Sequence, residues 1–577
     1  MNAYHFIGIG GAGMSVVAEL LADEGARVSG SDAKASQVTR RLAEEGLAVA
    51  VGHDAANVPP EATVVVSSAI RESNPELAVA RRRGQRILHR SQALALAAAG
   101  RDFVAVAGAH GKTTTSAMIA TALNGLGLDP SWAIGGTVMG VGGGGRLGGG
   151  RIFVAEADES DASFLNYAPR LALVTNVEPD HLDHYGSREA FEEAFADFTR
   201  RIVPGGLLVV CADSDGARRL AAQAVSEGIR AVSYGRGQGV DGVERHVRLG
   251  AADRGPSGIS GEVDDGDGAV TIELGVVGEH NLLNAAGAWT AGVELGVGRR
   301  EMAAALAGFA GTGRRFELRG VASGVRVVDD YAHHPTEVEA TLRTARDVVG
   351  DGAVRVLFQP HLYSRTREFA REFARALGLA DDVVVLEGGR VAERGATAQV
   401  LAAPVSDFAA RLTGTAVLTG ELAGDARAPA LELPRGQVVH GRPWDDDAGA
   451  RGEVLRPGGP GIALVPPDAV ALYREPPEGS PRNVLAGRVT GVERAGALVS
   501  VSVGLAGGQG VRAVVTAVAV AEMGIAVGQE LWCAIKAVEV RIVPRRAAPP
   551  MGRHAGSVDG PGAGGSTATA TSGRAER

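Results

Sequence analysis

Several residue types are scarce in this chain of 577 residues, and each scarcity excludes a class of protein. Only two cysteines occur, Cys211 and Cys533, both within apolar runs, so we expect buried thiols in a reducing compartment and no disulfide framework. The 58 basic residues are outnumbered by 67 acidic ones, which disfavours a nucleic-acid-binding protein. We find no apolar run near the ~18 residues of a membrane span and no leader-like N-terminus, so we expect a soluble, cytoplasmic protein.

Lysine is scarcer still, because only Lys34, Lys112 and Lys536 occur. Lys112 lies in "VAVAGAHGKTTTSAMIATAL" (104–123), which predicts a buried strand, a glycine turn and a helix. In such a loop, backbone N–H groups and the lysine hold phosphates, and the following threonine hydroxyl binds Mg²⁺. The usual G-x-x-x-x-G-K-[ST] motif would begin two positions before Gly108, so this shorter loop favours a specialised ATP-using ligase over an ordinary P-loop motor.

Glycine, in contrast, is abundant at 83 residues, so each Gly-rich motif is judged by its flanks. "YHFIGIGGAGMSVVAELLADEGARVSGSD" places G-x-G-x-x-G between an apolar strand and an amphipathic helix, with Asp32 about twenty residues further on. Such a turn lets backbone N–H groups approach a pyrophosphate. The motif predicts a site for NAD or for another diphosphate nucleotide; a turn that only packs helix on strand is the alternative.

Carboxylates follow two further apolar segments, "FVAEADESDASF" and "TNVEPDHLDHY". The ligands of a doubly wound sheet bind at the carboxyl ends of its strands. Glu156 with Thr113 and phosphate oxygens would suit Mg²⁺, whereas His181 would suit Mn²⁺ better. A solvated acidic loop is the alternative.

Eight motifs occur in order over about residues 3–385: "GIGGAGMS", "GAHGKTTT", "VAEADESDASF", "NVEPDHLDHY", "GEHNLLNAAGA", "GTGRRFE", "VVDDYAHHPTEVEATL" and "FQPHLYSRTREF". Together they closely resemble the Mur ligase family. The resemblance implies an ATP-dependent ligase of peptidoglycan precursor synthesis whose substrates are UDP-N-acetylmuramate, L-alanine and ATP. The muramate carboxylate would attack the γ-phosphate, and the amine of L-alanine would then displace phosphate from the acyl phosphate.

The resemblance also implies roles for individual residues, with UDP in place of NAD at the first glycine turn. The UDP-substrate residues would be Gly8, Gly10, Gly11, Gly13, Ser31, Asp32 and Ser67. The ATP-binding residues would be Gly108, His110, Gly111, Lys112, Thr113, Thr114, His280, Asn281, Asn284, Arg315 and Asp330. Metal would be bound by Thr113, Glu156 and His181. The catalytic residues would be Lys112, Glu156, His181, Arg315, His333, His361 and Arg365, the last two receiving alanine, with the Arg365 fork on its carboxylate.

The resemblance ends after "ALGLADDVVVL", and the next passage is similar to the segment that follows the nucleotide-binding core of an ABC transporter ATPase. A later stretch of alternating β-branched residues resembles the Mop (TOBE-type) barrel of a molybdate-importer ATPase, with "LAGGQ" as a hairpin turn. The expected fold class is α/β, a three-domain Mur ligase architecture followed by a small β-barrel. The expected boundaries are 1–98 (Rossmann-like UDP-substrate domain), 99–315 (central ATP-binding domain), 316–387 (truncated third domain), 388–479 (ABC-ATPase-like segment), 480–545 (barrel) and 546–577 (disordered tail).

Two functions therefore remain open. One is a ligase with an abnormal C-terminal part; the other is a hybrid that binds nucleotide but turns over little, because its truncated third domain would leave the last strand with an exposed edge and an apolar patch. An NAD-dependent dehydrogenase is a distant third. An oxyanion such as molybdate could bind the barrel, between the copies of an oligomer; a barrel that only packs is the alternative. Its candidate donors are Ser480, Arg482, Asn483 and Lys536.

Overall fold

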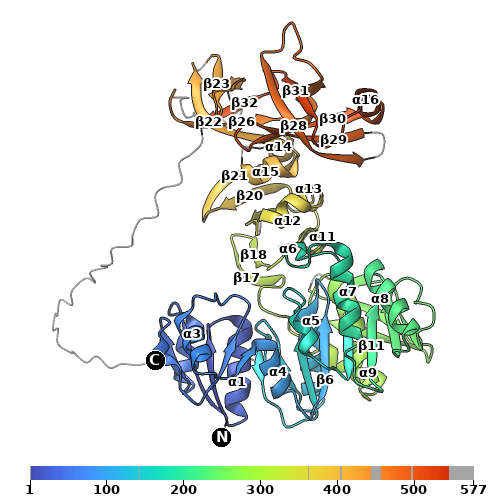
Figure 1. The fold of residues 1–577 in the computed structure, drawn as a ribbon. Coiled ribbons are helices and arrows are strands. Elements are labelled where there is room, and N and C mark those ends of the chain that lie inside the picture. The colour runs from blue at the N-terminus through green and yellow to red at the C-terminus, as the bar shows by residue number, and fades with distance from the viewer. Residues whose placement is uncertain are drawn as a thin grey trace, which may run out of the picture. The chain divides into compact units, whose positions relative to one another are not determined.

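The computed structural model describes residues 2–544 except 142, 256, 362, 403, 405, 426, 444–456 and 496–497. The chain divides into two compact units, residues 1–414 and 415–577 (Figure 1). Both cysteines are free and buried, as predicted. Among the described residues, no helix combines the length and the apolar character that crossing a membrane requires. The predicted tail, 546–577, lies outside the described residues.

The first domain is a five-stranded parallel sheet in the order β3-β2-β1-β4-β5. Its elements are β1 (Ala3–Ile7), α1 (Ala12–Asp23), β2 (Arg27–Asp32), α2 (Gln37–Glu44), β3 (Ala48–Val51), β4 (Thr63–Val66), α3 (Pro75–Arg82), β5 (Ile87–His89) and α4 (Arg90–Ala97). The strand order reverses between β1 and β4, which is where an open α/β sheet binds its ligand. The predicted glycine turn between β1 and α1 lies at this point, and Gly8 adopts φ 82°, a conformation that favours glycine.

The middle domain contains an eleven-stranded sheet in the order β14-β15-β13-β12-β11-β10-β6-β9-β7-β8, with β16 paired to β15. Its strands are β6 (Asp102–Ala107), β7 (Ser131–Ala133), β8 (Gly145–Arg146), β9 (Ile152–Glu156), β10 (Leu171–Val174), β11 (Leu207–Cys211), β12 (Ala231–Gly235), β13 (Arg245–Leu249), β14 (Asp253–Arg254), β15 (Ile259–Asp264) and β16 (Ala269–Leu274). Its helices are α5 (Lys112–Gly125), α6 (Leu182–Tyr185), α7 (Arg188–Thr199), α8 (Asp215–Ser226), α9 (Glu279–Glu294) and α10 (Arg299–Leu306). β6 pairs in parallel with β9 and β10, so the loops that follow these three strands meet at one edge.

The third domain contains a hairpin and a three-stranded sheet. Its elements are β17 (Glu317–Ala322), β18 (Val325–Asp329), α11 (Pro335–Val349), β19 (Arg355–Phe358), α12 (Tyr363–Glu368), α13 (Ala370–Leu377), β20 (Asp382–Glu387), β21 (Arg390–Ala396), α14 (Thr397–Ala402) and α15 (Asp407–Leu412). β20 pairs with β19 in parallel and with β21 antiparallel, from Asp382↔Ala396 to Glu387↔Arg390. The predicted exposed edge on β20 is therefore wrong, because β21, from the passage after residue 387, pairs with it.

The helices that follow β21 also contribute to the core of this domain. Its core residues include Val338, Leu342, Phe358, Phe373, Val383, Val385, Val400, Phe408 and Leu412, the last three from α14 and α15. These side chains lie on one face of the sheet. On the other face Leu357 is 64% exposed and Val391 is 51% exposed, so an apolar surface does remain in this domain, on a face of the sheet. The segment predicted as 388–479 is thus divided, since residues 388–414 belong to the first unit.

In its described residues, the second unit is built mainly from strands. Its elements are β22 (Ala416–Gly424), β23 (Pro429–Glu432), β24 (Val438–His440), β25 (Arg442–Pro443), β26 (Pro460–Val465), β27 (Val470–Tyr473), β28 (Asn483–Ala495), β29 (Leu498–Leu505), β30 (Gly510–Thr516), α16 (Ala517–Met523), β31 (Glu530–Ile535) and β32 (Arg541–Pro544). They form a six-stranded sheet, β24-β23-β22-β26-β32-β25, and a five-stranded one, β27-β31-β28-β29-β30, which share one core. "LAGGQ" is the predicted turn, and it joins β29 to β30.

Candidate active site

The phosphate loop connects β6 to α5, and close packing explains its two glycines. Gly108 has φ 130°, and a Cβ there would lie 2.2 Å from Thr175 Oγ1. Gly111 has φ 83°, and its Cβ would lie 2.8 Å from Asn284 Oδ1. Neither position accommodates a side chain, so the backbone of the loop stays exposed to a ligand.

Lys112 is turned back onto its own loop. Its Nζ donates to the Gly108 carbonyl at 2.6 Å and to Glu159 Oε1 at 2.9 Å. Burial would lower the pKa of Lys112, but the charges of Glu159 and Asp158 raise it, so the ammonium is charged. Burial raises the pKa of Glu159. A phosphate that enters the loop would replace Glu159 as the partner of this cation.

Two hard oxygen donors lie together beside the loop. Thr113 Oγ1 donates to Glu156 Oε2 at 3.0 Å, and the other carboxylate oxygen accepts the Gly135 N–H at 2.6 Å. Burial raises the pKa of Glu156, and the Gly135 hydrogen bond and the charges of Lys112 and Arg315 offset only part of that rise. A hydroxyl and a half-buried carboxylate at this separation fit Mg²⁺. The imidazole of His181 is a quarter exposed, and its role as the ligand of a second ion stays a prediction; such a ligand would suit Mn²⁺ better than Mg²⁺.

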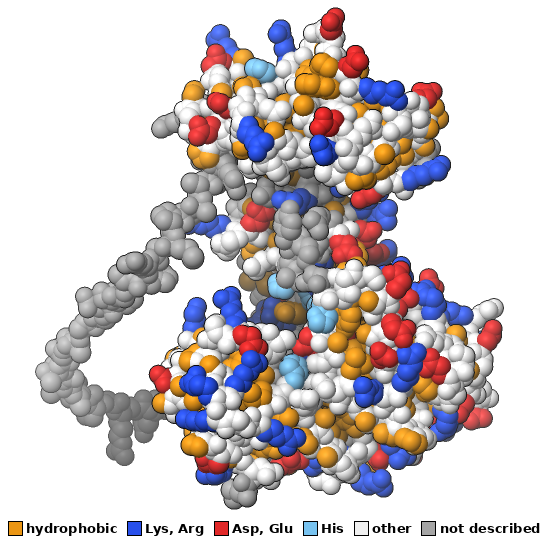
Figure 2. All heavy atoms as spheres, viewed as in Figure 1, with side chains coloured by type: hydrophobic (Ala, Val, Ile, Leu, Met, Phe, Trp, Pro, Cys, Tyr) orange, Lys and Arg blue, Asp and Glu red, His pale blue; other side chains and the backbone are white. Residues whose placement is uncertain are grey.

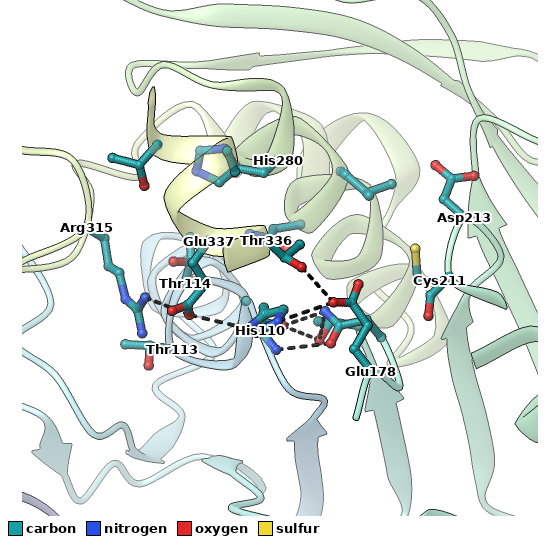
Figure 3. Close-up of a pocket in the computed structure, with 18 of the residues that line it drawn as sticks. His110, Thr113, Thr114, Glu178, Cys211, Asp213, His280, Arg315, Thr336 and Glu337 are labelled. Carbon is teal, nitrogen blue, oxygen red and sulfur yellow. Dashed lines mark hydrogen bonds and ion pairs between the residues drawn. The ribbon is translucent and has the colours of Figure 1, made fainter. Parts of the chain in front are cut away.

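A cavity of about 240 Å³ opens beside the loop (Figure 3). Among the predicted ATP-binding residues, its lining includes His110, Gly111, Thr113, Thr114, His280, Asn284, Arg315 and Asp330. Asn281 instead donates to the Val277 carbonyl at 2.7 Å, which is a structural role. Burial and the Arg315 charge lower the pKa of His280 to about 4, so this imidazole is neutral.

Several residues of this cavity were not predicted from the sequence. Cys211, Asp213 and Tyr234 line it from the ends of β11 and β12, opposite the phosphate loop (Figure 3). Their positions in the sequence could have indicated them, because strands that run parallel beside β10 end at the same edge of the sheet, where ligands bind. Burial raises the pKa of Cys211 to about 11, so its thiol is protonated and unreactive.

His110 joins the phosphate loop to the third domain. It forms ion pairs with Glu178 (Nε2 to Oε2, 3.4 Å) and with Glu337 of α11 (Nδ1 to Oε1, 3.5 Å). Thr336, the neighbour of Glu337, donates to Glu178 at 2.9 Å, and Figure 3 shows this pair of α11 residues facing His110 and Glu178. Burial would lower the pKa of His110, but the two carboxylates raise it to about 9. The sequence analysis missed both carboxylates, although each lies inside a quoted motif.

The same cluster also includes His334. Ligand atoms of His110, Glu178 and His334 lie within 4.8 Å of one another. The two imidazole rings are 4.5 Å apart between centroids, and burial and the His110 charge lower the pKa of His334 to about 4. A charged His110 between two carboxylates, packed against a neutral His334, accounts for this arrangement without a metal ion.

The two residues predicted to receive alanine differ in their surroundings. His361 is exposed, and its ring lies 5.9 Å from that of His333. Arg365 is buried, and its guanidinium is bound in a bidentate manner by Asp180, at 2.8 and 3.0 Å from Nη2. The fork predicted for the alanine carboxylate is thus engaged by the middle domain.

At the first glycine turn, the Gly10 N–H donates to Asp32 Oδ2 at 3.0 Å. The Ser31 hydroxyl donates to the fully buried Glu76. Burial would raise the pKa of Glu76, but hydrogen bonds from His5, Ser31 and other groups lower it to about 2. Ser67 is half-buried, and the adjacent Ser68 donates to Asp161 of the middle domain at 2.7 Å. The UDP-binding roles of Gly8, Gly10, Gly11, Gly13, Ser31, Asp32 and Ser67 stay predictions.

The four predicted oxyanion donors of the second unit differ in exposure. Ser480, Arg482 and Lys536 are exposed. Asn483 is fully buried, and its amide group accepts the His440 N–H at 2.6 Å and donates to the His440 carbonyl at 2.9 Å. Asn483 therefore ties β28 to β24, which leaves the exposed three as the better candidates.

Comparison with known families assigns the three domains of the first unit. The model described as "Mur ligase family, catalytic domain" matches residues 3–102, "Mur ligase middle domain" matches 106–292, and "Mur ligase, glutamate ligase domain" matches 314–430. A TOBE domain matches 479–542. Together with the phosphate loop and its oxygen donors, these matches define a class: the chain belongs to the Mur ligase family.

The relatives narrow the class further. The chain is 52% identical over 446 residues to the UDP-N-acetylmuramate–L-alanine ligase of Kineococcus radiotolerans, covering 76% of this chain and 93% of the relative. It is 49% identical to the enzyme of the same name from Renibacterium salmoninarum, covering 76% of this chain and 98% of the relative. Among solved structures it is similar to UDP-N-acetylmuramate-alanine ligase MurC of Thermotoga maritima, with a TM-score of 0.57, 31% identity and coverage of 67% and 85%.

Proposed function

We propose that this chain joins L-alanine to UDP-N-acetylmuramate with ATP, through an acyl phosphate, in the cytoplasmic assembly of a peptidoglycan precursor. The observation that carries the proposal is the phosphate loop with Lys112 beside the Thr113–Glu156 oxygen pair. It lies in a chain about half identical to ligases of that name over most of their length.

The chemistry explains why these groups are needed. A carboxylate is a poor acylating agent, so one of its oxygens first attacks the γ-phosphorus and ADP leaves. The alanine amine then attacks the carbonyl carbon, phosphate leaves, and the amine loses a proton. Lys112 offsets the repulsion between the carboxylate and the triphosphate, and its position is preorganised by Glu159. When bound at Thr113 and Glu156, Mg²⁺ supplies further positive charge.

The test is phosphate release by the full chain with UDP-N-acetylmuramate, ATP, Mg²⁺ and L-alanine, with the product identified by its mass. We expect release that requires both the muramate substrate and alanine. Absence of the alanyl product at all substrate concentrations, from a folded chain, would remove the proposal. NADH binding by the chain would instead favour the dehydrogenase.

A second candidate is a chain that binds its substrates better than it turns them over. The exposed apolar face of the β19-β20-β21 sheet favours it, because β19 and β20 pair in parallel and parallel strands are normally covered on both faces. A chain whose third domain is completed from an intact relative provides the comparison. Equal rates from the two chains would exclude this alternative.

The second unit supports a separate proposal. Its match to a TOBE domain and its exposed Ser480, Arg482 and Lys536 support an origin in an importer ATPase and binding of molybdate, with copies of the chain sharing the ion. Equilibrium dialysis of the full chain with molybdate tests it, with an Arg482→Gln variant as the control. Uptake that is absent at micromolar concentration, or unchanged in the variant, counts against the role.

A further inference from the structure

A buried ion pair connects the third domain to the middle domain. Arg365 of α12 is 3% exposed and Asp180, which follows β10, is 5% exposed. The arginine donates from Nε at 3.2 Å and from Nη2 at 2.8 Å to Asp180 Oδ1, and from Nη2 at 3.0 Å to Oδ2. Burial would raise the pKa of Asp180, but the charges of His181 and Arg365 lower it. A pair this buried adds little net stability, and its geometry is better explained by a positioning role.

The carboxylate that Arg365 holds also constrains the next residue in the chain. Asp180 Oδ1 accepts the backbone N–H of His181 at 2.8 Å, and Oδ2 lies 3.6 Å from His181 Nε2. His181 has φ 52° and ψ 33°, a left-handed conformation that is unfavourable for a residue with a side chain. Such a backbone persists only where its surroundings fix it. Asp180 thus holds the backbone N–H of His181 by a hydrogen bond and contacts its ring as an ion-pair partner.

We propose that Arg365 is a positioning residue, which acts through Asp180 to hold His181 as a metal ligand once the third domain has closed. The proposal rests on the proposed function only in taking His181 as a ligand. It explains why a third-domain arginine predicted to bind alanine is occupied by a middle-domain carboxylate. It also makes metal binding dependent on domain closure.

The test is Mn²⁺ binding by the full chain in the presence of a non-hydrolysable ATP analogue, measured from the EPR signal of free Mn²⁺. His181→Ala identifies the ion that depends on this imidazole. We expect Asp180→Asn and Arg365→Gln each to weaken the binding of that ion about tenfold, as loss of an outer-sphere partner does. The double variant should be no worse than either single one, because both remove the same interaction. Arg365→Lys keeps the positive charge but cannot bind the carboxylate in a bidentate manner. Its affinity for Mn²⁺ should therefore lie between those of the parent and Arg365→Gln.

A matched control is available between the same two domains. Asp347 Oδ2 of α11 lies 3.6 Å from Arg254 Nε of β14, in an ion pair at the surface. Asp347→Asn therefore makes the same chemical change as Asp180→Asn, but away from His181. We expect it to bind Mn²⁺ as the parent does. The proposal is overturned if His181→Ala leaves Mn²⁺ binding unchanged, if Asp347→Asn weakens it equally, or if Arg365→Gln raises only the KM for alanine. A parent chain that shows the Mn²⁺ pattern but no alanyl product would contradict the proposed function alone.

Discussion

Lys112 is the residue whose replacement has the most direct chemical consequence. Its ammonium is charged and aimed along the phosphate loop, so Lys112→Ala removes a preorganised cation that alanine cannot replace. We expect phosphate release to fall by ~10²–10³-fold with the fold intact by circular dichroism. A folded variant with near-parent turnover would show that Lys112 is not the phosphate lysine.

His110 gives a pH dependence whose sign follows from its carboxylate partners. Its pKa in the folded chain is about 9, above the ordinary 6.5, so its ion pairs contribute fully below pH 6.5 and are lost as the pH rises through 9. We expect His110→Gln to lower stability by about 2–3 kcal/mol near pH 6 and by much less above pH 9.5. The difference in stability is measured from the unfolding midpoints of the variant and the parent across this pH range. A difference that does not change with pH would contradict the assignment.

The position of a site residue at the end of a strand can be predicted from the sequence. The side chains that this residue contacts in the folded chain cannot. Lys112 and Thr113 follow a buried strand and Glu156 ends another, and their place at the edge of a parallel sheet can be predicted from that alone. The pairing of Arg365 with Asp180 depends instead on how the third domain meets the middle one across 185 residues of sequence. No local pattern encodes that contact.

At the scale of elements, β21 and α15 show that residues after 387 complete the sheet and the core of the third domain. The pairing of β21 with β20 could not be predicted from the sequence, because an antiparallel partner needs only a free edge and a suitable length. Phe408 of α15 is 3% exposed and packs against Phe358 and Phe373, at 5.3 and 6.2 Å between ring centroids.

We therefore expect Phe408→Ala to destabilise the third domain by about 3–5 kcal/mol, the usual result of removing a buried phenyl ring. Val391→Ala, on the exposed face of the same sheet, should change stability by less than about 0.5 kcal/mol. Denaturant unfolding of the two variants is the measurement. Similar values for both would mean that α15 does not pack as described.

For the whole molecule, the division after Gly414 separates every residue of the candidate active site from the second unit. A chain that ends at Gly414 should therefore bind ATP, and release phosphate with the ligase substrates, within about twofold of the full chain. Parallel assays of the two chains check this. A large loss would mean that the second unit supports catalysis.

The one-sided sheet of the third domain also has a consequence for how the molecule behaves in concentrated solution. Leu357 and Val391 on its open face, and Leu318, Val321 and Val327 of the β17–β18 hairpin, are each more than half exposed. Apolar side chains exposed in this way attract those of other copies, and the attraction strengthens with temperature and with sulfate. We expect a negative second virial coefficient by light scattering, shifted toward positive values by Leu357→Lys. An identical coefficient for parent and variant would mean that this sheet face does not govern the colloidal stability of the protein.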